Sequence, residues 1–386
     1  MKHNEVVNGY RIVNSPTNAG GGKCMWAFAE KSGKPYFIKQ FLSPKRPKPD
    51  AGGSERSKQV RLEACREFEQ RHRGIMKLLK PDMPGGGHLV LATDFFAHGS
   101  TYYKVTARID TSTLEKPQLL ESRQKCILLK TLAVSLQLLH EIDVVHGDLK
   151  PANVLVQKRT GNAFHIAKLI DFDDSYLTGK PPDREEIAGD SLYGAPEWRR
   201  YVQDDGSVKA EQLTTAVDIF ALGLMTHYYL TGALPQHSER FDSPADAVSA
   251  KEKLELDPRL TDRMRNLVLA MTSRAPASRP RIATVISTLK DSKVCDLVQR
   301  PPATSAASAT EASSNPLKED RDFPSPGRLR TNIKGTPRPR REPSSPRPET
   351  PSAATGAEPT APGGSSKASD ASRKSRVRIN LGDRRK

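Results

Sequence analysis

The sequence predicts an α+β protein with a small β-rich lobe, a larger helical lobe and a disordered C-terminal tail. Short stretches of alternating apolar residues fill the first hundred positions, and apolar residues at helical spacing dominate from Pro117 onward. The composition changes sharply after Leu297, where Pro, Ser, Ala, Thr and Arg replace the large apolar residues. We therefore expect the small lobe at residues 5–108, the helical lobe at 109–296 and the tail at 297–386.

In the small lobe, alternation between glycine or proline turns predicts strands, interrupted by one helix. The strands are expected at Tyr10–Val13, Met25–Glu30, Tyr36–Phe41, Leu89–Phe96 and Tyr102–Thr106. The helix is expected at Ser57–Leu79, after the loop LSPKRPKPDAGGSE. In the larger lobe, helices are expected within 119–142 and at Ala216–Thr231, Leu260–Thr272 and Ile282–Leu289. Strands followed by helices in this order favour an α+β architecture.

The tail carries about half of the excess positive charge. The whole chain has a formal net charge of +16, and residues 301–386 hold 17 Lys and Arg against 9 Asp and Glu, a net charge of +8. With almost no large apolar residues, this segment cannot bury enough surface to offset the entropy of ordering. It is predicted to be disordered, either as a solvated linker or as an arm that docks an acidic partner, nucleic acid or another polyanion.

The cysteines and the N-terminus indicate the compartment. Four scattered cysteines show neither disulfide-framework nor zinc-site spacing, which favours a reducing compartment. The N-terminal stretch MKHNEVVNGYRIV lacks the apolar run of a signal peptide, and no stretch reaches the apolar length of a membrane span. We therefore expect a cytoplasmic protein.

The stretch HGDLKPANVL and the later stretch IDFDD carry side chains suited to phosphoryl transfer. This chemistry needs a positioned acceptor hydroxyl, cations on the phosphate oxygens and acidic ligands that hold those cations. Asp148 is a candidate to accept the hydroxyl proton, and Lys150 is a candidate to steady the transferring group. Asn153 and Asp171 are candidate magnesium ligands.

These two stretches, followed in order by YGAPEW, VDIFALGL and SRP, resemble the eukaryotic-type serine/threonine protein kinase family across nearly the whole folded region. The resemblance implies the bilobed protein-kinase fold, with 5–108 as its N-lobe and 109–296 as its C-lobe. It also implies transfer of the γ-phosphoryl group of ATP to Ser or Thr hydroxyls of protein substrates, with Mg²⁺ as the metal. The segments FLSP, CREFE, YYKVT and DFDDSY resemble a cytosolic bacterial subgroup of this family.

Carried over residue by residue, the resemblance makes Asp148 the catalytic base and Lys150 the lysine that contacts the phosphate. It makes Asn153 and Asp171 the Mg²⁺ ligands, and it places Leu155 in the floor under the adenine. The presence of Lys150 two residues after Asp148 is typical of the serine/threonine class.

The resemblance also implies supporting contacts in the C-lobe. Glu197 is expected to pair with Arg279, and Asp218 is expected to anchor the backbone of the catalytic loop. His146 and Phe172 are expected to stack in an apolar column that links the lobes.

Lys39 in YFIKQF corresponds to the family's lysine that grips the α and β phosphates of the nucleotide. On a strand it shares one face with Phe37 and Phe41, which favours a position in a cleft over a solvated one. Its carboxylate partner is expected on the following helix. We favour Glu69, because the buried stripe of that helix lies near it, and Glu67 is the alternative.

The remaining nucleotide contacts are expected from a glycine loop and a hinge. The loop runs from Asn18 to Lys23 and contains Gly20, Gly21 and Gly22. Glycines let backbone amides approach phosphates. By resemblance, Thr106 is the gatekeeper, and Ala107 and Ile109 offer backbone groups to the adenine.

Among the departures from the family pattern, three bear directly on the catalytic segments. Gly147 stands where an arginine commonly binds a phosphate on the activation loop, so activity is expected to be independent of activation-loop phosphorylation. Asp173 replaces a glycine after Asp171, and we expect it to restrict the backbone there. Asp190 stands where serine/threonine kinases usually have a threonine, and we expect it to pair with Lys150.

Two other functions stay open. A small-molecule phosphotransferase of the aminoglycoside or choline kinase type also carries HGD and IDFDD, but it usually lacks the APE triplet, the helix that starts near Asp218, and Arg279. A pseudokinase scaffold needs a broken ATP or metal site, and the departures lie beside the candidate ligands rather than on them.

Overall fold

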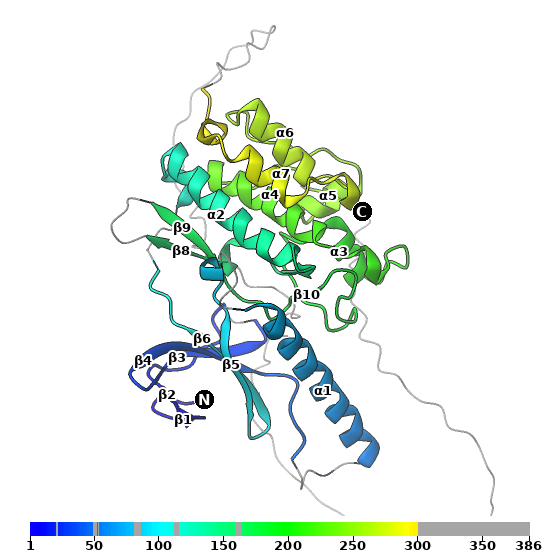
Figure 1. The fold of residues 1–386 in the computed structure, drawn as a ribbon. Coiled ribbons are helices and arrows are strands. Elements are labelled where there is room, and N and C mark those ends of the chain that lie inside the picture. Colours follow the sequence, from blue (N-terminus) through cyan, green and yellow to red (C-terminus); the bar gives the residue numbers. More distant parts are fainter. Residues whose placement is uncertain are drawn as a thin grey trace, which may run out of the picture. The chain divides into compact units, whose positions relative to one another are not determined.

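The structure is a computed structural model that describes residues 1–20, 22–48, 52, 54–80, 86–111, 116–158 and 164–299. The chain divides into two compact units at Ile333, and every described residue belongs to the first unit. The predicted tail therefore lies outside the described residues from position 300 onward. Figure 1 shows the sheet and one long helix at one end of the first unit, and a larger group of helices at its other end.

The N-lobe is built on a six-stranded sheet in the order β1-β2-β3-β4-β6-β5, with antiparallel neighbours throughout. Its strands are β1 (Val6–Val7), β2 (Tyr10–Ile12), β3 (Cys24–Lys31), β4 (Lys34–Phe41), β5 (Ala92–His98) and β6 (Thr101–Ala107). The five predicted strands are confirmed, and β1 is additional. Strand β5 begins later than predicted because Leu89 forms a bridge with Leu169 of the C-lobe instead.

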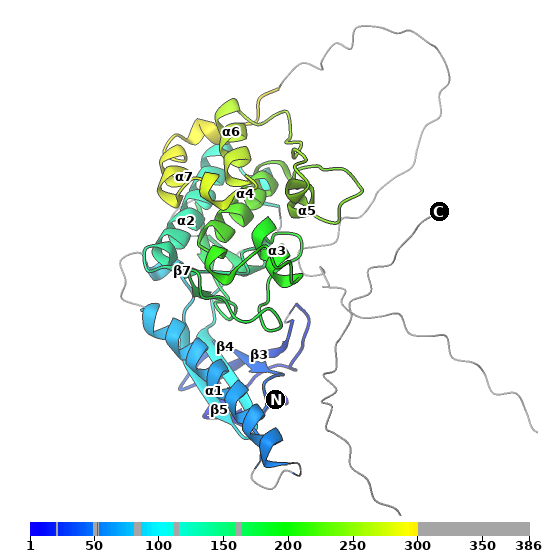
Figure 2. The same ribbon diagram turned by 90° about the vertical axis from the view of Figure 1, so that its right-hand side faces the viewer.

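Helix α1 (Glu55–Leu78) packs on one face of this sheet and lies beside β5 in both views (Figures 1 and 2). The helix begins where the Ser54 side chain accepts a hydrogen bond from the Ser57 amide, an ordinary N-cap. Its buried stripe recurs at helical spacing and consists of Cys65, Phe68, His72 and Ile75. This stripe decides which side chains of α1 face the sheet.

The two faces of the sheet carry separate clusters of apolar side chains. Phe41 of β4 and Tyr102 of β6 pack with Phe68 of α1 on one face. Ile38 and Val105 belong to the cluster on the other face. Because side chains alternate along a strand, Lys39 and Lys104 lie on the face that α1 covers.

The C-lobe is organised around α2 (Ser122–His140) and α4 (Ala216–Thr231). Helix α4 was predicted with these bounds, and it is buried around nearly its whole circumference. The other helices are α3 (Pro196–Val202), α5 (Pro244–Ser249), α6 (Asp262–Met271) and α7 (Ile282–Thr288). Figure 2 shows them grouped with α2 and α4. None of the helices in the described part of the chain has the length and apolar character that crossing a bilayer requires.

Two small strand pairs in the C-lobe carry the candidate catalytic segments. Strand β7 (Val144–Val145) pairs with β10 (Tyr176–Leu177), and β8 (Val154–Lys158) pairs with β9 (His165–Leu169). The stretch HGDLKPANVL leaves β7 and enters β8, whereas IDFDD leaves β9. The two pairings therefore bring both stretches to the same end of the C-lobe.

Candidate active site

The catalytic-loop candidate Asp148 is the centre of a hydrogen-bonded group. Its carboxylate lies 2.8 Å from Lys150 Nζ and accepts a hydrogen bond of 2.9 Å from Asn153 Nδ2. The same amide nitrogen donates to the Asp148 backbone oxygen at 2.7 Å. The structure therefore brings together the three residues that the sequence singled out in this loop.

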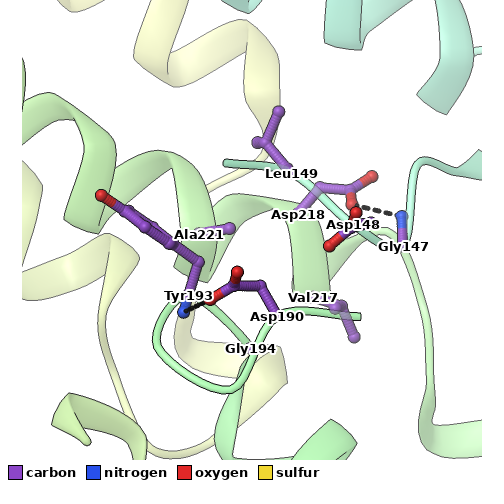
Figure 3. Close-up of a pocket in the computed structure, with 9 residues that line it drawn as sticks. All are labelled: Gly147, Asp148, Leu149, Asp190, Tyr193, Gly194, Val217, Asp218 and Ala221. Atoms are coloured by element: carbon purple, nitrogen blue, oxygen red, sulfur yellow. Dashed lines mark hydrogen bonds between the residues drawn. The ribbon is translucent and has the colours of Figure 1, made fainter. Parts of the chain in front are cut away.

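Lys150 bridges two carboxylates, because Asp190 Oδ2 lies 3.6 Å from its Nζ. The predicted pairing of Asp190 with Lys150 is therefore confirmed. Burial opposes the charge of Lys150, but Asp148 and Asp190 outweigh it and raise the pKa of Lys150. Asp190 also accepts hydrogen bonds from the Leu192 and Tyr193 amides, which fixes its carboxylate (Figure 3).

Asp218, near the start of α4, binds the backbone of the loop that carries Asp148. Its two carboxylate oxygens accept hydrogen bonds from the backbone amides of His146, at 2.8 Å, and Gly147, at 3.1 Å. Figure 3 shows Asp218 directed at Gly147, beside Asp148. The predicted anchoring of the catalytic-loop backbone is thus confirmed.

Gly147 has a conformation and surroundings that suit glycine alone. Its φ is +82°, in the left-handed region, and a Cβ at this position would lie 2.6 Å from the backbone oxygen of Asp174. An arginine at 147 would need the loop or the segment of Asp174 to move. The local backbone geometry therefore accounts for glycine at this position in place of the family's arginine.

Asp171 follows β9 and has a φ of +66°, which is uncommon for a residue other than glycine. The neighbouring Phe172 packs edge-on against His146, with ring centroids 5.4 Å apart, so the predicted stacking is confirmed. Strained backbone of this kind persists where the surroundings fix it, commonly at functional sites. The Phe172 ring supplies that restraint on one side of Asp171.

Lys39 of β4 reaches across to the segment after β9. Its Nζ lies 2.6 Å from Asp171 Oδ1 and 2.9 Å from Asp173 Oδ2. Burial opposes the charge of this lysine, but Asp171 and Asp173 together raise its pKa. Lys39 is therefore directed away from solvent, and its ion pairs join the N-lobe sheet to the metal-ligand candidate Asp171.

The carboxylate partner of Lys39 differs from the prediction. Glu69, which the sequence favoured, accepts a hydrogen bond of 2.7 Å from the Tyr102 hydroxyl, and Glu67 is exposed. The face of α1 that points toward the cleft carries His72, whose Nδ1 lies 3.9 Å from Asp173. The expected pairing was wrong because the helical stripe continues from Phe68 to His72, which turns both glutamates away.

The glycine loop and the hinge lie at the ends of N-lobe strands. Gly20 and Gly22 have left-handed φ values of +67° and +55°, and no atoms lie within 4 Å of a Cβ built on either one. Gly21 lies outside the described residues. The hinge and floor candidates are Thr106 and Ala107 at the end of β6, Ile109 just after it, and Leu155 on β8.

The donor set suits a hard cation. In the described part of the chain, no three His, Cys, Asp or Glu side chains gather into a metal-binding group. Mg²⁺ commonly takes only one or two protein ligands and completes its shell with phosphate oxygens and water. The Asn153 amide nitrogen is turned to Asp148, which directs its oxygen the other way, so Asn153 and Asp171 can each offer an oxygen.

The C-lobe anchor predicted from the sequence is present. Arg279 makes a two-pronged contact with Glu197, with N–O distances of 2.6 and 2.8 Å. The sequence reasoning missed Lys104, whose Nζ lies 2.7 Å from Asp173, and it missed His72. Alternation along YYKVT places Lys104 beside Tyr102 on one face, and this signal could have found it.

The chain is similar to known protein kinases. The family described as "Protein kinase domain" matches residues 19–289. "Serine/threonine-protein kinase pkn3" of Myxococcus xanthus is 28% identical over 49% of this chain and 36% of its own length. "Serine/threonine-protein kinase ULK3" of Xenopus laevis is 26% identical over 50% of this chain and 37% of its own length. "Serine/threonine-protein kinase pim-2" of Danio rerio is 27% identical over 56% of this chain and 60% of its own length. The chain thus spans less than two thirds of each of these relatives.

Proposed function

Because the chain belongs to the protein kinase family, we propose that it transfers the γ-phosphoryl group of ATP to Ser and Thr hydroxyls of protein substrates. The observation that carries the proposal is that Lys150 and Asn153 both contact the carboxylate of Asp148. The relatives named serine/threonine-protein kinases support the choice of acceptor.

In this function, Asp148 accepts the proton of the attacking hydroxyl. Asn153 holds one oxygen of Asp148 and Lys150 contacts the same carboxylate, so its orientation is set before substrate binds. Lys150 also brings a positive charge to the transferring phosphoryl group, where negative charge accumulates. The pKa of Lys150 is raised, so the lysine stays cationic at neutral pH.

The nucleotide phosphates bind beside Lys39 and Asp171, which lie next to one another. Lys39 contacts the α and β phosphates, while backbone amides of the glycine loop cover them. The adenine lies between the hinge and Leu155. Asp171 and Asn153 hold Mg²⁺, which when bound neutralises the charge of the phosphate oxygens.

A protein substrate is favoured over a small molecule by the C-lobe. The buried pair of Glu197 and Arg279 ties α3 to the segment before α7, and Asp190 ties the loop that precedes α3 to Lys150. These contacts support an ordered loop next to Asp148, where a peptide can lie extended. A small-molecule phosphotransferase has no use for such a loop.

We further propose that phosphorylation of the activation segment is not needed. At Gly147 a side chain would collide with the Asp174 backbone, so an arginine that reads an activation-loop phosphate has no room there. The double variant Thr178→Ala/Ser191→Ala is expected to keep phosphotransfer within about twofold of wild type, because no phosphate at either position is needed to order the segment. Loss of most activity in the double variant would refute independence.

The direct test of the function is transfer of labelled phosphate from ATP to a generic basic protein in the presence of Mg²⁺. We expect phosphoserine and phosphothreonine in the product. The variant Asp148→Asn should lower the rate by about 10²–10⁴-fold, the usual contribution of general base catalysis. An active Asp148→Asn variant would point to contaminating kinase, and a wild type that binds nucleotide without transferring phosphate would indicate a pseudokinase.

Two further features remain proposals. The basic composition of residues 301–386 supports docking of an acidic partner or polyanion. A cytoplasmic location is favoured by the cysteine usage. Deletion of 301–386 is expected to leave activity on a generic substrate unchanged.

A further inference from the structure

Two largely buried lysines lie side by side on one face of the N-lobe sheet. Lys39 of β4 and Lys104 of β6 are direct cross-strand partners, and both side chains lie on the face that α1 covers. The Lys104 side chain is 7% exposed and that of Lys39 is 16% exposed. Like charges directly opposite each other destabilise a sheet, and burial adds to the cost. The pair therefore requires an anion between the two ammonium groups.

Asp173 supplies that anion from the C-lobe. Its Oδ1 lies 2.7 Å from Lys104 Nζ, and its Oδ2 lies 2.9 Å from Lys39 Nζ, so each oxygen serves one lysine. Two short contacts of the charge-assisted kind, one to each lysine, therefore fix the carboxylate.

Helix α1 offers no charge at this position. His72 is the residue of its buried face nearest to the cluster, and burial together with Lys104 lowers its pKa to about 3. It is therefore neutral at physiological pH. The glutamates of α1 are used elsewhere or exposed: Glu55 pairs with Lys58, Glu63 pairs with Arg66, Glu69 bonds Tyr102 and Glu67 faces solvent.

Asp171 is the second carboxylate on Lys39, but it has a competing task. As a candidate Mg²⁺ ligand, it must offer its oxygens to a cation when nucleotide binds. Asp173 is tied to Lys104 as well as to Lys39, so it can remain with the lysines when Asp171 turns to the metal. Asp171 thus contacts one lysine of the sheet, Lys39, whereas Asp173 contacts both Lys39 and Lys104.

We infer that Asp173, held in place by Lys104, is the carboxylate that positions Lys39 for the nucleotide phosphates, in the place where the sequence led us to expect a glutamate of helix α1. Asp173 and Lys104 are positioning residues, because they act through Lys39. The lysine is then set by the segment after β9 and by β6. Its orientation does not depend on where α1 lies. This inference rests on the proposed kinase function.

The experiment measures the dissociation constant of Mg·ATP by calorimetry and the thermal midpoint of the full chain. Asp173→Asn is expected to weaken nucleotide binding by about tenfold or more, as for loss of one charge-assisted hydrogen bond. It should also lower the thermal midpoint, because Lys104 loses its anion and Lys39 loses one of its two carboxylates. Glu69→Gln and Glu67→Gln are the matched comparisons, and each is expected to bind Mg·ATP within twofold of wild type.

The double variant Asp173→Asn/Lys104→Met separates positioning from stability. Removing Lys104 as well relieves the uncompensated charge, so the thermal midpoint should recover while nucleotide binding stays weak. Recovery of both would show that Asp173 only neutralises Lys104 and would overturn the inference. A further loss of nucleotide affinity in the double variant would also overturn it, because Lys104 would then contact phosphate itself. A tenfold loss in Glu69→Gln or Glu67→Gln would restore the role to α1.

Calorimetry keeps this inference separate from the proposed function. A wild type that binds Mg·ATP but transfers no phosphate would reject phosphoryl transfer, and the ratio of dissociation constants would still decide the role of Asp173. A wild type that binds no Mg·ATP would overturn both.

Discussion

The buried ion pair of Glu197 and Arg279 and the charge cluster around Lys39 both join segments far apart in the chain, but they are built differently. In the C-lobe pair, both side chains are almost fully buried, and the guanidinium and the carboxylate face each other in a two-pronged contact. In the N-lobe cluster, two lysines share two aspartates. In the C-lobe pair one guanidinium meets one carboxylate and otherwise donates to backbone oxygens, among them those of Ser273 and Ala216. In the cluster, two carboxylates share one lysine.

This difference fits the proposed roles of the two regions. A two-pronged pair holds one geometry, which suits the proposed anchor of the loop next to Asp148. In the proposed function, a shared cluster lets Asp171 turn to a cation while Asp173 stays with the lysines. Similar buried charges can thus form a fixed contact in one lobe and a shared one in the other.

The largest effect should follow from breaking the C-lobe pair. Arg279→Ala leaves Glu197 buried without a partner, and we expect the free energy of unfolding to fall by about 3–5 kcal/mol. Urea unfolding followed by tryptophan fluorescence measures this change. Arg281→Ala is the matched control, because Arg281 is exposed only two residues away, and it should change the free energy of unfolding by less than about 0.5 kcal/mol. Equal effects of the two variants would show that the pair is no anchor.

An intermediate effect on the free energy of unfolding is expected at Gly147 in the loop that carries Asp148. Gly147→Ala should cost more than the about 1–2 kcal/mol that a left-handed conformation costs an ordinary residue, because its Cβ would meet the Asp174 backbone. Gly33→Ala is the control: Gly33 has a similar φ of +72°, but nothing lies within 4 Å of its Cβ. If the two variants lose the same stability in urea, the close contact at Gly147 carries no cost.

The smallest effect should come from the hydrogen bond that turns Glu69 away from the cleft. Tyr102→Phe removes this bond, and we expect a loss of about 0.5–1.5 kcal/mol in the free energy of unfolding. The dissociation constant of Mg·ATP should stay unchanged. A tighter or weaker constant, measured by calorimetry, would mean that Glu69 can reach Lys39 when released.

The sequence was sufficient for the contacts of the C-lobe. Asp148, Lys150 and Asn153 lie within one short loop, so their spacing along the chain fixes their neighbourhood in space. Asp218 and Arg279 were also placed correctly by resemblance, because they contact backbone or side chains at fixed points of that pattern.

The sequence was insufficient for the partner of Lys39. That contact depends on the rotation of α1, where a step of one residue turns a side chain by about 100° around the helix and moves it out of the buried stripe. The sequence indicated a buried stripe near Glu69, and the structure shows that His72 belongs to that stripe. Asp173 was noticed only as a missing glycine, because nothing in its own segment reveals Lys104 on a distant strand.

The most direct test is an experimental structure of the chain with Mg²⁺ and a non-hydrolysable ATP analogue. We predict that Lys39 Nζ lies within hydrogen-bond distance of both a nucleotide phosphate and Asp173, with Mg²⁺ on Asp171 and Asn153. Lys39 paired with Glu67 or Glu69, or directed away from the phosphates, would contradict the account.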